Sequence, residues 1–237
     1  MRLGLFGAGG RMGRRITALL GDFPEIELHR AVGRGDAADF TGCDVVIDVS
    51  MAAATATLME GLGSCALVTG VTGRDTGQQA LVDAHPGPLF VAANFSVGVA
   101  ALGAALRQVL GAMPEAEVEI HELHHRHKAD APSGTALELG RIAAQAQGIE
   151  WPRGRAVREG ETGPRGRSVG LSAGRGGEVV GEHTVFVFGA GERVELVHRA
   201  ADRSIFARGA LRAALWLAEQ GPGRYGMSDL IVGLSSR

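Results

Sequence analysis

The chain has 237 residues, of which 45% are hydrophobic and 21% charged, and its formal net charge is −2. This length and composition predict two modest folded domains, and the charge gives no electrostatic basis for binding nucleic acid. The sequence has no apolar run of about 18 residues and no signal-peptide pattern, and its two cysteines form no disulfide framework. We therefore expect a cytoplasmic protein without membrane contact.

The amino terminus predicts the opening of a βαβ unit. A short apolar strand leads into a glycine-rich turn, residues 7–13, and a helix follows over about residues 11–20. Glycines at 7, 10 and 13 allow a tight turn, close approach of a dinucleotide pyrophosphate, and close packing of helix on strand. The spacing departs from G-x-G-x-x-G, because Met12 occupies the last glycine position. A purely structural glycine turn is the alternative.

The next predicted strand, residues 25–32, ends where a Rossmann fold contacts the adenosine ribose. Gly33 and Arg34 occupy that place. A guanidinium favours the cofactor with a 2′-phosphate, and Arg11 can assist it, whereas Asp36 can still reach a ribose hydroxyl. The sequence therefore favours NADPH, with NADH also possible.

The remainder of the first half alternates strands with helices. Apolar strands at 45–49, 66–69 and 89–92 alternate with helical stretches at 52–61 and 75–84, which is typical of a doubly wound parallel sheet. Strand ends carry the ligand-facing residues in such sheets, so residues 70–73 and 92–96 are candidates for contact with a nicotinamide ring. Asn94, the chain's only asparagine, is equally well explained as a turn residue.

The pattern changes after Ser96, which predicts a domain boundary. We expect a helix at 97–113, a strand at 117–121, a helix at 134–147, a loop at 151–167, strands at 168–173, 178–188 and 192–199, and a closing helix at 205–219. The predicted fold is α/β, with a Rossmann-like doubly wound parallel sheet plus a smaller α+β domain with a mixed sheet. Residues 1–96, completed by 205–237, would bind the dinucleotide, and residues 97–204 would bind substrate and form the oligomer.

Lys128 is the only lysine among 24 Lys and Arg residues. It lies in the densest run of ionisable residues, 121–130, which also holds four of the eight histidines. An ammonium is a compact donor that can release its proton, and histidine exchanges protons near neutral pH. The run therefore predicts acid–base or anion chemistry, with Lys128, Arg126 and His125 supplying positive charge.

A turn and a helix follow this run. Pro132 disfavours helix at the preceding residue, Ser133 can cap, and apolar residues then recur at helical spacing. The first amides of the helix, those of Gly134 and Thr135, have no intrahelical acceptors and lie at the positive end of the helix dipole. We expect a carboxylate or phosphate of a small dianion to bind there.

Two other interpretations of the run stay open. Histidines this close can ligate a metal, although Arg126 and Lys128 would repel a divalent cation and neither Cys43 nor Cys65 lies nearby. The run can also be a solvated charged loop without a function. We predict no metal site.

The run ELHHRHKADAPSGTA, residues 122–136, resembles the signature of the bacterial dihydrodipicolinate reductases, also named 4-hydroxy-tetrahydrodipicolinate reductases. The resemblance extends to residues 7–13, 70–72, 92–99, 181–184, 191–193 and 213–217. It implies an NAD(P)H-dependent reductase of diaminopimelate and lysine biosynthesis, a cytoplasmic homotetramer that transfers hydride to the conjugated imine of a small cyclic dicarboxylate. A non-catalytic NADPH sensor and a reductase of another small acid are the alternatives.

The resemblance also implies roles for single residues. His124 would be the proton donor or acceptor and Lys128 the catalytic lysine, beside substrate contacts from His125, Ser133, Gly134 and Thr135. The implied cofactor contacts are Gly7, Ala8, Gly9, Gly10, Arg11, Met12, Arg34, Gly70, Val71, Thr72, Ala92, Ala93, Asn94 and Phe95. The chain departs from the family pattern at Gly33, where many members carry an acid, at Val71, where a threonine is frequent, and at 50–52, which lacks a proline. The first domain also looks shortened.

Overall fold

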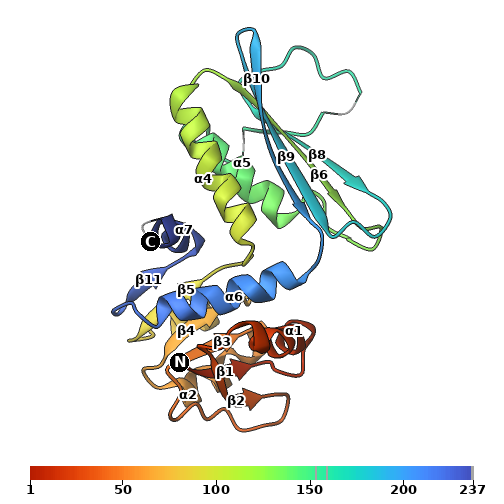
Figure 1. The fold of residues 1–237 in the computed structure, drawn as a ribbon. Coiled ribbons are helices and arrows are strands. Elements are labelled where there is room, and N and C mark those ends of the chain that lie inside the picture. Colours follow the sequence, from red (N-terminus) through yellow and green to blue (C-terminus); the bar gives the residue numbers. More distant parts are fainter. Residues whose placement is uncertain (153, 159, 236–237) are drawn as a thin grey trace. The chain divides into compact units, whose positions relative to one another are not determined.

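The computed structural model describes residues 1–152, 154–158 and 160–235, so positions 153 and 159 of the predicted 151–167 loop lie outside the described residues. The described chain forms two compact units, one of residues 1–97 and 204–237 and the other of residues 98–203 (Figure 1). The first has a parallel α/β sheet and the second a mixed sheet with helices. The predicted fold class is confirmed.

Within the described residues, the first unit contains a sheet of six parallel strands. In sheet order they are β2 (Glu27–Val32), β1 (Arg2–Phe6), β3 (Val45–Asp48), β4 (Ala66–Thr69), β5 (Pro88–Val91) and β11 (Gly223–Tyr225). The order along the chain reverses between β1 and β3. Ligands of doubly wound sheets bind at the carboxyl ends of the strands at such a reversal, which is where the glycine turn lies.

Helices cover both faces of this sheet. Buried residues of α1 (Arg11–Leu19), α6 (Ser204–Leu217) and α7 (Met227–Ser235) share one hydrophobic cluster with β1, β3 and β4. Those of α2 (Thr55–Leu62) and α3 (Thr76–Asp83) share another with the opposite face. Because both faces are covered, β3 and β4 are buried along their whole length and are apolar up to their last residues, Asp48 and Thr69.

Three features of the first unit differ from the sequence prediction. The chain continues beyond the expected closing helix into β11 and α7, which were missed. Short 3-10 turns, η1 (Leu20–Asp22) and η2 (Ala52–Ala54), follow α1 and precede α2. Residues 33–44, all of them described, connect β2 to β3 without a helix, which accounts for the shortened appearance of this half.

The second unit, as far as it is described, has a five-stranded sheet in the order β10 (Glu192–Ala200), β9 (Gly181–Gly189), β6 (Glu117–His124), β8 (Val169–Arg175) and β7 (Arg155–Ala156). It is mixed, since β6 runs parallel to β8 and antiparallel to β9. Buried residues of α4 (Val97–Ala112) and α5 (Gly134–Ala146) pack against one sheet face (Figure 1).

Two strand boundaries in this unit were predicted incorrectly. β6 runs to His124 rather than to residue 121, because pairing with both β8 and β9 extends it through the polar run. β9 begins at Gly181 rather than at residue 178. The predicted loop at 151–167 also contains the short strand β7.

Candidate active site

The glycine turn is fixed to the neighbouring strand. The backbone amides of Gly7 and Ala8 donate to the carbonyl of Val32 at 2.9 and 3.1 Å, and Gly7 has a φ of +86°. A Cβ at Gly13 would overlap the carbonyl oxygens of Gly7 and Ala8, so a glycine there lets α1 approach the turn. Gly13 therefore has the close-packing role, and Met12 does not. The amides at the start of α1 lack intrahelical acceptors and suit a pyrophosphate.

A cavity of about 370 Å³ lies within the first unit. Met12 from the start of α1, Gly70 after β4, and residues 93–95 after β5 contribute to its wall, so three predicted cofactor segments meet there. The complete lining is Met12, Val49, Ser50, Gly70, Ala93, Asn94, Phe95 and Phe206. A Cβ at Gly70 would lie 2.5 Å from the Phe95 ring, so the ring rests on bare backbone. Val49, Ser50 and Phe206 were not predicted.

Nine predicted cofactor residues do not line this cavity: Gly7, Ala8, Gly9, Gly10, Arg11, Arg34, Val71, Thr72 and Ala92. Ala92 is buried, and Val71 and Thr72 continue the loop after Gly70. Asn94 lines the cavity, but its side-chain oxygen also accepts the Ser96 amide at 2.8 Å, which is the alternative turn role.

The turn after β2 carries an exposed arginine. The Gly33 amide donates to the Asp36 carboxylate at 2.8 Å, so Asp36 holds the turn together. Arg34 is exposed at the tip, and within the described ranges no carboxylate pairs with it or with Arg11. The Val32 carbonyl accepts from the glycine turn, and Arg34 follows Val32 by two residues, which brings Arg34 to the same edge of the sheet as that turn. This arrangement suits a phosphate on the ribose.

A buried ion pair supports the carboxyl ends of β3 and β4. Arg74 Nη2 lies 3.0 Å from Asp48 Oδ2, and their side chains are 3% and 1% exposed. Asp48 also accepts from Thr69 Oγ1 at 2.9 Å and from Ser50 Oγ at 2.6 Å, while Arg74 Nη1 donates to the Val71 carbonyl at 3.1 Å. The pair thus fixes the loop after Gly70. Sequence reasoning missed it, although a lone carboxylate ending an apolar strand was a usable signal.

The second unit holds a buried carboxylate beside a histidine. Along β6, residues 118, 120, 122 and 124 share the buried face, which places Glu122 and His124 side by side. Glu122 is fully buried and accepts Arg175 at both oxygens, 2.9 Å each, the Ser133 amide at 3.0 Å, and His124 Nδ1. Burial alone would raise the pKa of Glu122, but the hydrogen bonds from Arg175, His124 and Ser133 outweigh it and lower that pKa.

The His124 ring has two further close neighbours, His183 and Gly181. The His183 ring meets it edge to face, with centroids 5.2 Å apart, and a Cβ at Gly181 would lie 2.9 Å from His124 Nε2. His183 Nε2 lies 3.2 Å from Ser133 Oγ. Burial lowers the pKa of His124, Glu122 opposes this, and the charges of Lys128 and Arg175 add to the lowering.

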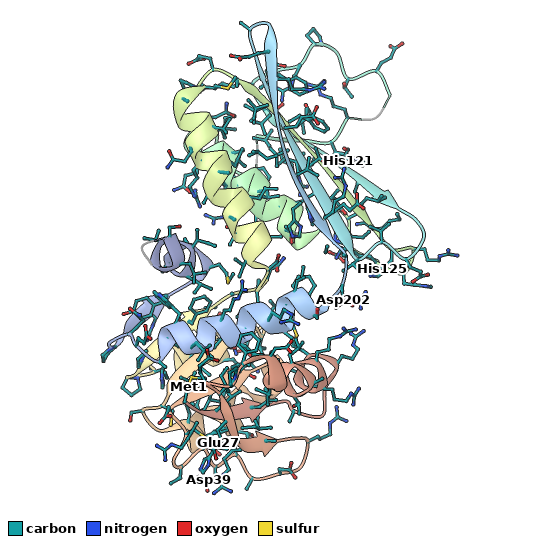
Figure 2. The ribbon with its side chains drawn as sticks, in the orientation of Figure 1. Met1, Glu27, Asp39, His121, His125 and Asp202 are labelled. Atoms are coloured by element: carbon teal, nitrogen blue, oxygen red, sulfur yellow. The ribbon has the colours of Figure 1, made fainter. Side chains whose placement is uncertain are left out.

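Lys128 lies in a turn beyond β6, close enough for its charge to affect His124. Its Nζ contacts the Asp130 carboxylate at 2.7 and 2.9 Å, and its backbone amide donates to the His125 carbonyl at 3.1 Å. Figure 2 labels His125 just beyond the end of β6. Arg126 instead pairs with the exposed Glu178 at 3.6 Å.

The predicted cap of α5 is present. Ser133 Oγ accepts from the Ala136 amide at 3.2 Å, and α5 begins at Gly134. A Cβ at Gly134 would meet nothing within 4 Å, so this helix start is open. The structure thus brings His124, Lys128 and Ser133 into one region, joined through Glu122 and Arg175.

Two further observations concern the described residues alone. Nowhere among them do three His, Cys, Asp or Glu side chains gather so as to hold a metal ion. None of their helices combines the length and apolarity needed to cross a membrane.

Comparison with known proteins assigns the chain to a family. The family model described as "Dihydrodipicolinate reductase, C-terminus" matches residues 98–231. The 4-hydroxy-tetrahydrodipicolinate reductase of Acidiphilium cryptum is 43% identical over 98% of this chain and 97% of the relative. That of Alkalilimnicola ehrlichii is 40% identical over 97% and 98%. The chain belongs to the dihydrodipicolinate reductase family. The resemblance seen in residues 122–136 is therefore confirmed.

Solved structures agree with this fold. A dipicolinate-bound dihydrodipicolinate reductase from Paenisporosarcina sp. TG-14 superposes with a TM-score of 0.76 at 21% identity, over 97% of this chain and 98% of that one. The scyllo-inositol dehydrogenase of Lactobacillus casei gives 0.59 at 12% identity, over 100% and 93%. The reductase is an oxidoreductase of diaminopimelate and lysine biosynthesis that uses a nicotinamide cofactor to reduce 4-hydroxy-tetrahydrodipicolinate, a small cyclic dicarboxylate.

Proposed function

We propose that His124 supplies the proton in this reduction, with substrate bound at the end of β6 and the start of α5. The observation that supports this is the His124 ring. It is buried and anchored through Nδ1, while Nε2 has no hydrogen-bond partner among the described residues. A bound nicotinamide supplies the hydride. A positioned imidazolium with one open nitrogen can protonate the developing enamine carbon, which is general acid catalysis.

We further propose that Lys128 and the first amides of α5 hold a substrate carboxylate. Lys128 has a 21% exposed side chain, and its partner Asp130 is 62% exposed. Such a surface pair contributes at most about 1 kcal/mol, so a substrate carboxylate can displace it. The open helix start adds a positive dipole end. The proposed substrate contacts besides Lys128 are His125, Ser133, Gly134 and Thr135.

NADPH is the proposed preferred cofactor, with NADH also accepted. The pyrophosphate would lie at the glycine turn and the start of α1, and the nicotinamide in the cavity beside Gly70 and Phe95. Arg34 would contact the 2′-phosphate, with Arg11 assisting. Asp36 accepts from the Gly33 amide and so holds the turn that carries Arg34.

The decisive experiment follows NADPH oxidation with freshly generated 4-hydroxy-tetrahydrodipicolinate. His124→Gln should lower turnover by about 10²–10⁴-fold and leave dipicolinate binding largely intact, because glutamine cannot deliver a proton. Lys128→Ala should lower turnover and also weaken dipicolinate. His127→Gln, in the same run but 71% exposed, is the control and should behave as wild type. Near-normal turnover of His124→Gln across neutral pH would show that another group supplies the proton.

Cofactor preference is tested separately. Arg34→Ala should weaken NADPH much more than NADH, because a charge-assisted hydrogen bond is worth roughly 1.5–3 kcal/mol. Arg30→Ala, on β2 and paired at 4.0 Å with Asp39, is the control. Equal losses for both cofactors in Arg34→Ala would refute the assignment.

We also propose a cytoplasmic homotetramer in which the first unit binds the dinucleotide and the second binds substrate and forms the assembly. Family membership supports this, as does β10, an edge strand whose Val197 is 42% exposed. An edge strand can pair across subunits. A monomeric mass in light scattering at assay concentration would contradict the assembly.

A further inference from the structure

We infer that Glu122 is a positioning residue for the reduction, holding the His124 ring with its proton on Nδ1 so that proton transfer occurs at Nε2. This inference rests on the proposed function, since it requires His124 to move the proton. Glu122 itself touches neither substrate nor cofactor in this scheme.

The hydrogen bonds around Glu122 fix which nitrogen carries the proton. An ionised carboxylate can only accept, and the donors around this one are the Arg175 fork, the Ser133 amide and His124 Nδ1. The hydrogen shared with His124 therefore lies on Nδ1. In the neutral ring the lone pair is then on Nε2, beside the glycine at 181 that leaves room for it. A carboxylate that orients a histidine through Nδ1 is a recurrent arrangement in proton transfer.

Arg175 keeps this carboxylate charged. Glu122 is 0% exposed, and a buried carboxylate without a partner would take up a proton and lose the negative charge that holds the Nδ1–H of His124. Arg175 contacts both its oxygens and also donates to the Asp130 carbonyl. One guanidinium thus connects the anchor of the proton-transferring histidine to the loop that carries Lys128.

The charges around His124 determine in which direction its pKa should change when the charge of Glu122 is removed. Glu122 raises the pKa of His124 through its hydrogen bond and its charge, whereas burial, Lys128 and Arg175 lower it. The neighbouring imidazole of His183 is buried and itself faces His198 and Lys128. Removing the Glu122 charge leaves the lowering contributions in place, so the protonated form of His124 should be lost at a lower pH.

The test compares Glu122→Gln with Glu119→Gln in the full-length protein. Glu119 lies on the same strand but on its other face, where it pairs with Arg165 at 3.1 Å. Glu122→Gln should lower kcat/KM at least about 100-fold and move its alkaline limb to lower pH by about one unit or more. NADPH and dipicolinate binding should change by about twofold or less. Glu119→Gln should match wild type, and Glu122→Asp should recover part of the activity and of the pH profile.

A spectroscopic measurement is independent of turnover, and its wild-type arm does not depend on how the variants fold. Imidazole nitrogen shifts of wild-type His124 should report the Nδ1–H form of the neutral ring, and Glu122→Gln should shift toward the Nε2–H form, because the amide can donate to Nδ1. An Nε2–H ring in wild type, or an unchanged pH profile in Glu122→Gln, overturns the inference. A wild-type protein that has the Nδ1–H ring, with a His124→Gln variant that keeps near-normal turnover, would instead refute the proposed role of His124.

Discussion

His183 predicts how the stability of the second unit depends on pH. It is 4% exposed on β9, and burial, followed by the charge of His124, lowers its pKa to about 4 from the ordinary 6.5. Between these values the unfolded chain binds more protons than the folded one, so the free energy of unfolding falls as pH drops from 6.5 toward 4. The pKa difference corresponds to about 3 kcal/mol.

The perturbation is His183→Gln, whose amide can still bond Ser133 Oγ but does not titrate. Urea unfolding should be measured from pH 7 to pH 4.5, in a Trp216→Phe background, so that the fluorescence of Trp151 reports on the second unit. Wild type should lose most of that ~3 kcal/mol over the range, and the variant should lose much less. His127→Gln, which removes an exposed histidine, should follow wild type. Parallel curves for wild type and His183→Gln would refute the reasoning.

Three further changes probe other parts of the structure. Gly13→Ala puts a Cβ against backbone carbonyls, and such overpacking costs about 1–3 kcal/mol, so both unfolding free energy and NADPH affinity should fall. Asp48→Asn leaves Arg74 buried without its carboxylate and should destabilise by about 3–5 kcal/mol, and a double variant that adds Arg74→Met should recover part of the loss in urea unfolding. Gly181→Ala puts a Cβ against His124 Nε2, so turnover should fall while NADPH affinity stays unchanged. Steady-state assays of the variant and wild type measure both quantities.

The sheet of the first unit could be predicted because its signals are local. Glycine turns and short apolar runs indicate the strands and their order along the chain. The structure has two of these strands at 45–48 and 66–69. The last strand and helix were missed because Gly221, Pro222 and Gly223 follow the closing helix and read as the end of regular structure. Pairing of β11 with β5, a contact distant in sequence, orders that segment.

The candidate site was predictable where one segment carries it. His124, Lys128 and the Ser133 cap all lie within ten residues, so spacing alone brought them together. Arg175 and His183 come from β8 and β9, more than 40 residues further on, and only strand register places them beside β6. The alternation of buried and less buried residues along β6 indicated part of this arrangement. It places Glu122 on the buried face, where a carboxylate requires partners.

The first unit is built from both ends of the chain, and this affects the order in which the protein is made. Its hydrophobic cluster joins β1 and β3 to α6 and to Leu230, so it lacks part of its core until residues 204–230 have been synthesised. The second unit is continuous from residue 98 to 203 and is complete earlier. On the ribosome the amino-terminal strands therefore keep apolar surface exposed while the inserted unit folds. A chain released before residue 204 lacks α6 and α7, two of the three helices that cover one face of the first sheet.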